Sequence, residues 1–149
     1  MICSLILGRK GSVGFPSKNL YKIYGQPVSW HSMQAALNTP EIDRNFMSTD
    51  DPELVNLAKK VGFEVIDRPA YLATSEALGD DAYKHGYDII TKLIGEEPEL
   101  LILMFCNAPT IRPEQISEGI NMLRNDLSAD SAVSVSRYNM YSPTRARRV

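Results

Sequence analysis

Short runs with strand character alternate along this chain with stretches whose apolar residues recur every three or four positions. The strand-like runs are residues 2–7, 44–49, 63–66, 99–105 and 131–136. The helical patterns between them are residues 26–39, 51–62, 80–93 and 112–126. Strands joined by helices of this length require right-handed crossovers and pair in parallel. The pattern therefore predicts an α/β fold with a mostly parallel sheet.

Helix signals are clearest at residues 51–62. Asp51 suits the N-cap, Pro52 suits the first helical position, and Gly62 suits a left-handed C-terminal position. Asp50 and Asp51 together also resemble a pair of metal ligands, but capping explains Asp51 better. His31 and His85 fall within predicted helices, where we expect ordinary structural roles.

The run "ELLILMF", residues 99–105, is continuously apolar, which predicts a central parallel strand covered on both faces. Residues 68–79 show no clear period and predict a long loop, and long ordered loops are often functional. Ligands of open parallel sheets bind beyond the carboxyl ends of the strands. The segments expected there are residues 8–19, 48–51, 68–79, 106–112 and 136–148.

Charge is unevenly distributed, although the net charge is only -2. Residues 1–19 hold Arg9, Lys10 and Lys18 without one acidic residue, and residues 137–149 hold four arginines, again without an acid. A nucleic-acid partner usually requires a broad basic face and a basic overall balance. The distribution instead favours a small anionic ligand that meets two basic segments, and we expect no nucleic-acid partner.

The composition is ordinary for a globular protein, and we expect a cytoplasmic location. No apolar run approaches the roughly 20 residues of a membrane span, and the start "MICSLIL" lacks the basic region and cleavage site of a signal peptide. We therefore expect no membrane partner. Cys3 and Cys106 lie in apolar strand-like runs, where a thiol behaves as a small hydrophobic group.

The loop "GRKGSVGFPSKN", residues 8–19, has glycines at positions 8, 11 and 14. This spacing matches neither the dinucleotide-binding motif nor the P-loop. Glycines nevertheless let backbone N–H groups approach a phosphate closely, while Arg9, Lys10 and Lys18 supply charge. The loop therefore predicts a polyphosphate site, with a mobile surface loop of solvated cations as the alternative.

Four stretches resemble one family. "LGRKGSVGFPSKNL" resembles the N-terminal signature of the cytidylyltransferases that activate sialic acid, Kdo and related acidic sugars. "MSTDDPELVNLAKKVGFEV", "RPAYLAT" and "SADSAVSVS" resemble later motifs of that family, in the same order. The resemblance covers essentially the whole chain.

The resemblance implies a three-layer α/β nucleotidyltransferase fold, a homodimer, and one reaction. CMP is transferred from CTP to the anomeric hydroxyl of a 2-keto sugar acid, with release of pyrophosphate and with Mg²⁺ as the cofactor. Family members continue well past residue 149. We therefore expect one nucleotidyltransferase domain over residues 1–149 that lacks its C-terminal part, either as a fragment or as a naturally shortened protein.

The same resemblance implies roles for individual residues. Arg9 and Lys18 would neutralise the phosphates and carry catalysis. Arg145 would bind the sugar carboxylate, with a solvated tail as the alternative. The resemblance also implies nucleotide contacts by Ser12, Asn19 and Arg68. From the residues themselves, we expect Gly8 and Gly11 to let the loop approach the phosphates, and Asn107 to take over a hydrogen bond where the family's glutamine is missing. For Arg68 the alternative is pairing with Asp67 or a helix end, and for Asn107 it is a turn position.

Departures from the family pattern leave the base and the metal open. Val13 stands where many members have a lysine, and "LMFCNAPTIR" lacks the expected glutamine or aspartate, which affects Phe105 and Asn107. "TSEALGD", around Gly79, also differs. No metal ligand is assigned. Besides the acidic-sugar cytidylyltransferase, the sequence leaves open a nucleotidyltransferase for another sugar or alcohol, and a noncatalytic nucleotide-binding module.

Overall fold

The computed structural model describes residues 1–11 and 14–135. Four parallel strands form its main sheet in the order β5-β4-β1-β6. These strands are β1 (Ile2–Gly8), β4 (Arg44–Thr49), β5 (Glu64–Asp67) and β6 (Leu100–Phe105). All three strand pairs are parallel, which confirms the predicted α/β class.

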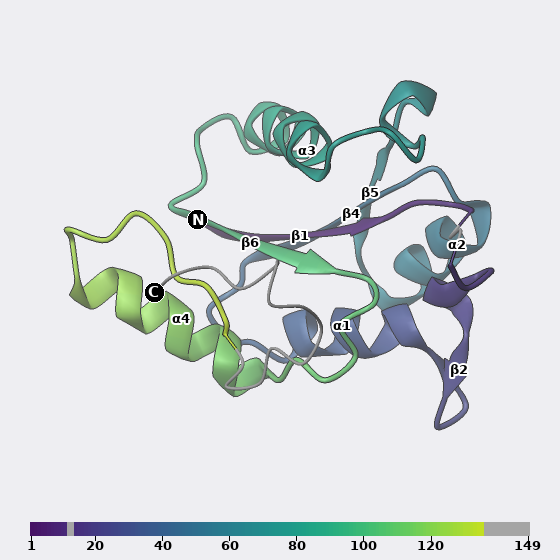
Figure 1. Ribbon diagram of the computed structural model, residues 1–149. Coiled ribbons are helices and arrows are strands. Elements are labelled where there is room, and N and C mark those ends of the chain that lie inside the picture. Colours follow the sequence, from purple (N-terminus) through teal and green to yellow (C-terminus); the bar gives the residue numbers. More distant parts are fainter. Residues whose placement is uncertain (12–13, 136–149) are drawn as a thin grey trace, which may run out of the picture.

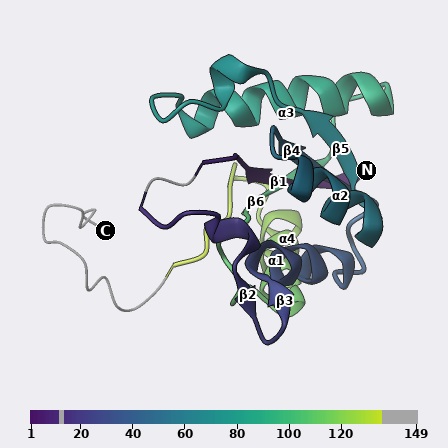
Figure 2. The same ribbon diagram turned by 90° about the vertical axis from the view of Figure 1, so that its right-hand side faces the viewer.

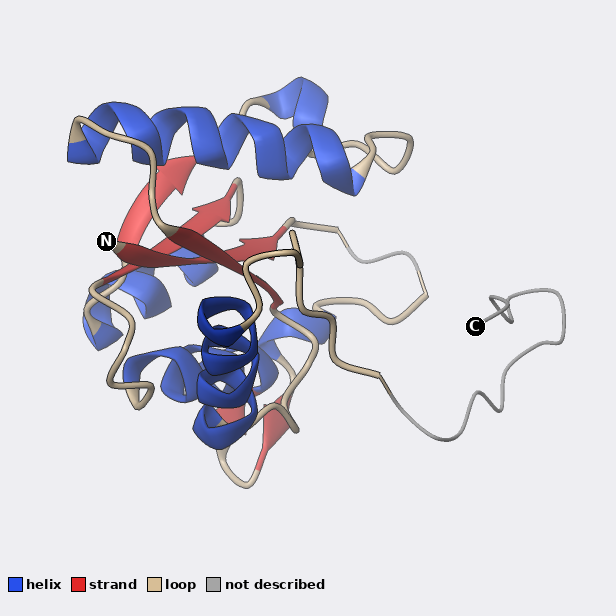
Figure 3. Cartoon of the chain, turned by 90° about the vertical axis from the view of Figure 1, so that its left-hand side faces the viewer, coloured by secondary structure: helices blue, strands red, loops and turns tan. Residues whose placement is uncertain are grey.

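Helices cover both faces of this sheet, so the described part of the chain has three layers (Figures 1 and 3). On one face lie α1 (Val28–Leu37), α2 (Pro52–Val61) and α4 (Pro113–Asn125). The opposite face is covered by α3 (Gly79–Ile94), as Figure 2 shows most plainly. The shorter elements are η1 (Lys18–Leu20), β2 (Lys22–Ile23), β3 (Gln26–Pro27) and η2 (Ala70–Leu72). None of the helices in the described residues is long and apolar enough to cross a membrane.

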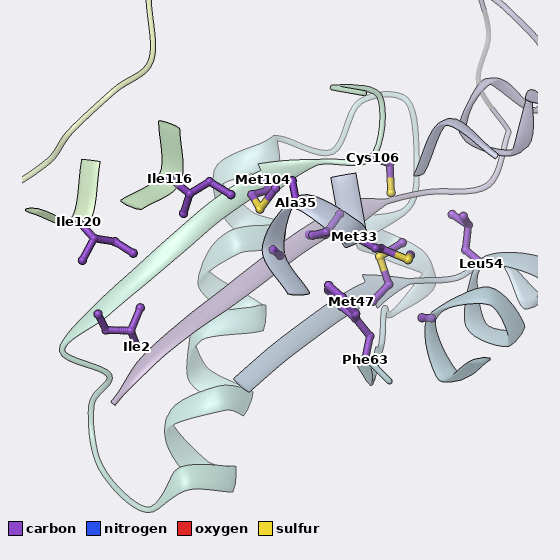
Figure 4. Close-up of a cluster of buried hydrophobic side chains, with 13 residues drawn as sticks. Ile2, Met33, Ala35, Met47, Leu54, Phe63, Met104, Cys106, Ile116 and Ile120 are labelled. Carbon is purple, nitrogen blue, oxygen red and sulfur yellow. The ribbon is translucent and has the colours of Figure 1, made fainter. Parts of the chain in front are cut away.

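The alternating side chains of β1 divide the core into two clusters. Ile2 and Ile6 pack toward α1, α2 and α4, in the larger cluster drawn in Figure 4. Cys3 and Leu5 pack toward α3. Gly86 lets α3 approach closely, because a Cβ at this position would lie 2.5 Å from Leu5 Cδ2. Both cysteines are free and buried, as predicted.

Helix α2 begins and ends where the sequence predicts. Asp51 is the N-cap, and its side chain accepts a hydrogen bond from the backbone N–H of Glu53 at 2.9 Å. Pro52 opens the helix, and Gly62 follows it with a φ of 95°. The capping interpretation of Asp51 is confirmed.

The prediction that residues 99–105 form a central strand is wrong for the described residues. Strand β6 lies at an edge of the sheet, and β1 takes the central place. Helix α3 packs on β1 and β4, so Leu103 and Phe105 remain 48% and 55% exposed. An apolar run identifies a strand, but it does not specify how far the covering helix extends.

A fifth strand at residues 131–136 is also not found, since residues 131–135 adopt no regular structure. A strand requires a hydrogen-bonded neighbour. This segment instead lies against α4, where the Ala132 Cβ is 3.8 Å from the position that a Cβ on Gly119 would take. Ser136 lies outside the described residues.

Candidate functional site

The loops that follow β1, β5 and β6 surround a cavity of about 400 Å³ at the carboxyl ends of the strands. This volume lies within the range of about 300–1,000 Å³ that is typical of small-molecule sites. The lining residues are Leu7, Gly8, Arg9, Gly14, Lys18, Asn19, Arg68, Leu72, Thr74, Ala77, Leu78, Gly79, Ala82, Phe105 and Asn107. Of the eight residues expected to act on the nucleotide, six line the cavity, Gly11 is not among its lining residues, and Ser12 lies outside the described residues.

Gly8 ends β1 and is required by the packing beneath the cavity. A Cβ at this position would lie 2.5 Å from Cys106 Sγ and 2.8 Å from Met47 Cε. Side chains larger than hydrogen therefore do not fit without displacing the core. Gly11 has a φ of 74°, the left-handed conformation that favours glycine, and it does not line the cavity.

Two of the predicted cations reach the cavity from this loop. Arg9 and Lys18 are both half-buried and line it, whereas Lys10 is exposed. The Arg9 guanidinium donates a hydrogen bond from Nη1 to the carbonyl oxygen of Gly11 at 3.2 Å. Asn19 is buried, and its Nδ2 donates to the carbonyl oxygen of Arg9 at 3.4 Å. Ser12, the remaining predicted contact in the loop, lies outside the described residues, as does Arg145.

A carboxylate just beyond β4, the neighbour of β1 in the sheet, holds the loop by a hydrogen bond. Asp50 follows β4, and its Oδ1 accepts a hydrogen bond from the backbone N–H of Lys10 at 2.8 Å. No group of three or more histidine, cysteine or acidic side chains within residues 1–11 and 14–135 is suited to hold a metal ion.

Arg68 is the most deeply buried cation of the site, at 6% exposure. It follows β5, and its partners are the side chain and the carbonyl oxygen of Ser48 on β4. The alternative pairing with Asp67 is therefore not found among the described contacts. Burial lowers the pKa of the Arg68 guanidinium, and the nearby Asp50 carboxylate opposes this effect. A guanidinium nevertheless stays charged at neutral pH.

The cavity lining also contains apolar side chains. It includes Leu72, Leu78, Ala82 and the exposed ring of Phe105. Phe105 packs edge-on against Tyr83, with 6.1 Å between ring centroids. Burial raises the pKa of Tyr83 to about 12. The sequence predicts the loop that supplies Leu72 and Leu78, but it does not indicate that these two residues line the cavity. An irregular loop has no hydrophobic periodicity from which the buried side chains could be identified.

Asn107 enters the cavity from the loop after β6. The residue before it, Cys106, is buried beneath the site, and burial raises the pKa of its thiol to about 12. Ser32 on α1 donates from Oγ to the carbonyl oxygen of Ala108 at 3.1 Å. The loop that carries Asn107 is thus attached to the helix layer.

A second hollow, of about 720 Å³, lies between the end of α1 and α4. Its lining contains Glu114 and Glu118 but no cation. A polyphosphate would meet repulsion there. The chemistry of an anionic ligand fits the cavity at the strand ends instead.

A family model described as "Cytidylyltransferase" matches residues 3–147. The N-acylneuraminate cytidylyltransferase of Escherichia coli O18:K1:H7 (strain RS218 / NMEC) is 26% identical over 138 residues, which cover 93% of this chain and 32% of that protein. The 3-deoxy-manno-octulosonate cytidylyltransferase of Thermodesulfovibrio yellowstonii is 26% identical over 129 residues, 84% of this chain and 48% of that protein.

A similar solved structure is that of CMP:2-keto-3-deoxy-manno-octonic acid synthetase complexed with CTP. Its TM-score is 0.67 at 24% sequence identity, and the match covers 85% of this chain and 48% of that one. This similarity shows the fold. The chain thus spans 32% to 48% of the length of these proteins.

Proposed function

Because this chain belongs to the cytidylyltransferase family, we propose that its cavity binds CTP. We further propose that the chain is the nucleotide-binding part of an enzyme that transfers CMP to an acidic 2-keto sugar. The support comes from the family match and from the charges around the cavity. The family match alone would not identify which residues act.

One observation carries the proposal: the residues that line the cavity include three cations and no carboxylate. Arg9 and Lys18 come from the first loop, and Arg68 comes from the end of β5. An arginine binds two phosphate oxygens at once, and a lysine acts as a point charge. The three side chains together suit a triphosphate, and the apolar side chains of the lining suit a nucleobase.

In the proposed reaction the anomeric hydroxyl of the sugar attacks the α-phosphorus of CTP. The bond from this phosphorus to the oxygen that bridges it to the β-phosphate breaks, pyrophosphate leaves, and the hydroxyl proton is released to solvent. Arg9, Lys18 and Arg68 would hold the triphosphate in line and offset the charge that accumulates on its oxygens. This is catalysis by positioning and charge, without a covalent intermediate on the protein.

Other parts of the proposal rest on the resemblance alone. These are the acidic class of the sugar, the binding of its carboxylate by Arg145, the requirement for Mg²⁺ and a homodimer. Arg145→Ala in a pyrophosphate-release assay should raise the KM for the sugar without changing the affinity for CTP. Arg148→Ala, which removes a neighbouring charge, serves as the control.

Calorimetry against CTP, UTP, ATP and GTP tests the proposed ligand. We expect CTP to bind most tightly. Equal or tighter binding of another nucleotide would favour a nucleotidyltransferase that uses a different base. Binding without pyrophosphate release, with sialic acid or Kdo and Mg²⁺ present, would favour a noncatalytic nucleotide-binding module. Failure to bind any of the four would overturn the proposal.

A further inference from the structure

We infer that Asp50 is a positioning residue that holds the cationic loop in its nucleotide-binding conformation. The inference rests on the proposed function, because it gives Asp50 a part in the binding of the nucleotide by Arg9 and Lys18. Asp50 itself is not among the residues that line the cavity. Its effect on the ligand is therefore indirect.

The sheet brings Asp50 to the start of the loop. Strands β1 and β4 are parallel neighbours, and Gly8 pairs with Thr49 at their carboxyl ends. Asp50 is the first residue beyond β4, and Lys10 is the second beyond β1. The carboxylate Oδ1 lies 2.8 Å from the Lys10 backbone nitrogen, a good distance for a charge-assisted hydrogen bond.

This hydrogen bond holds one side of a peptide unit whose other side is also held. The backbone nitrogen of Lys10 and the carbonyl oxygen of Arg9 belong to the same peptide group. Asp50 accepts from that nitrogen, and Asn19 Nδ2 donates to that oxygen at 3.4 Å. Two side chains from opposite directions thus fix the plane of the peptide that follows Arg9, and we call this arrangement the peptide clamp.

The clamp determines where Arg9 lies. A peptide plane that rotates changes the backbone dihedral ψ of the residue before it, and so moves the chain on either side. Arg9 follows the buried Gly8 directly, so its backbone is held by the sheet on one side and by the clamp on the other. Its side chain is therefore aimed at the cavity before a ligand arrives, which lowers the entropic cost of binding.

Other roles for Asp50 are less well supported. The helix cap of α2 is Asp51, not Asp50. Among the described residues no salt bridge involves Asp50, and no metal-ligating cluster includes it. A carboxylate near a triphosphate site also adds repulsion to ligand binding. Its hydrogen bond to the loop accounts for an aspartate at this position in spite of that repulsion.

The test compares Asp50→Ala and Asp50→Asn in the full chain, with Asp67→Ala as the control. An asparagine keeps an oxygen acceptor for the Lys10 N–H but removes the charge. Asp67 is an exposed carboxylate at the same edge of the sheet, in the register position next to Thr49, and it makes no described bond to the loop. We expect Asp50→Ala to weaken CTP binding about tenfold. Asp50→Asn should stay within about threefold of the parent, and Asp67→Ala should bind like the parent.

Hydrogen exchange of the Lys10 amide gives a second measurement that needs no nucleotide. It should be faster in Asp50→Ala than in the parent, and Asp50→Asn should restore much of the protection. The inference is overturned if Asp50→Ala leaves both the CTP affinity and the exchange rate of the Lys10 amide unchanged. It is also overturned if both variants bind CTP equally and more tightly than the parent, because removal of the negative charge alone would have that effect. If the parent does not bind CTP, the proposed function fails, and Lys10 exchange alone decides whether the clamp exists.

Discussion

The guanidinium of Arg68 donates two hydrogen bonds to one residue, Ser48. Its Nη2 lies 2.7 Å from the carbonyl oxygen of Ser48, and its Nε lies 3.2 Å from the hydroxyl oxygen. These bonds link the end of β5 to the end of β4 and fix the guanidinium at the base of the cavity. Among the described residues no carboxylate lies within ion-pair distance of Arg68. A buried cation with only neutral partners suits an anion that arrives from solution.

Replacing Arg68 should lower the affinity for CTP without lowering the melting temperature of the protein. We expect Arg68→Met to keep or raise the melting temperature, because a buried charge is costly and an apolar side chain of similar length fills the space. The same variant should lose most of its affinity for CTP. Thermal melts and calorimetry on the same preparation measure both quantities. A large drop in melting temperature together with unchanged affinity would show that Arg68 is structural.

The two loop cations should affect binding and not folding. Charge-assisted hydrogen bonds to a phosphate are worth about 1.5–3 kcal/mol each, so Arg9→Ala and Lys18→Ala should each weaken CTP binding by a factor of about 10 to 150. The melting temperature should change little, because neither side chain belongs to the core. Calorimetry gives the affinities.

Lys59→Ala is the matched control, since this exposed lysine lies in the last turn of α2. It should bind CTP like the parent. Equal effects of all three substitutions would indicate a general influence of net charge, and no effect of Arg9→Ala or Lys18→Ala would mean that the loop is a solvated surface segment.

Much of the fold followed from local sequence signals. The boundaries of α2 could be predicted because Asp51, Pro52 and Gly62 each satisfy a backbone requirement that few residues meet. The strand at residues 44–49 was predicted at its observed bounds. The place of β6 could not be predicted, because strand order depends on which helix covers which strand. The packing of a helix on a strand depends on residues that are far apart in the sequence, so a local pattern does not predict it.

The charged residues of the candidate site could be predicted from the sequence, but the contacts that hold them in place could not. Arg9 and Lys18 could be predicted because they are cations in a loop without acidic residues. Arg68 could be predicted because it opens the family-like motif "RPAYLAT". The partnership of Asp50 with Lys10 joins residues 40 positions apart and depends on the parallel register of β1 and β4. The need for a glycine at position 8 could not be predicted either, because Cys106 and Met47, which leave no room for a Cβ there, are distant in the sequence.

The Cys106 thiol should be unreactive in the folded protein. Burial raises its pKa to about 12, and the thiolate is the reactive form, so at pH 8 almost none of it is present. Burial also raises the pKa of Cys3. Iodoacetamide at pH 8 should therefore modify neither cysteine until denaturant is added, after which both should react. Mass spectrometry of the intact protein counts the modified thiols, and rapid alkylation of Cys106 in native buffer would contradict the described burial.

Gly8→Ala should destabilise the protein and disturb the site together, because this residue joins the core to the loop. The added Cβ would lie 2.5 Å from Cys106 Sγ, 2.8 Å from Met47 Cε and 2.9 Å from Leu54 Cδ1, which is closer than side chains normally approach. Overpacking of this kind costs about 1–3 kcal/mol of unfolding free energy. Gly79→Ala is the control, since no atom lies within 4 Å of its added Cβ. Urea denaturation of both variants measures the difference. If Cys106→Ala, which removes the nearest of the three atoms, restores no stability to Gly8→Ala, the contact with the thiol is not the cause.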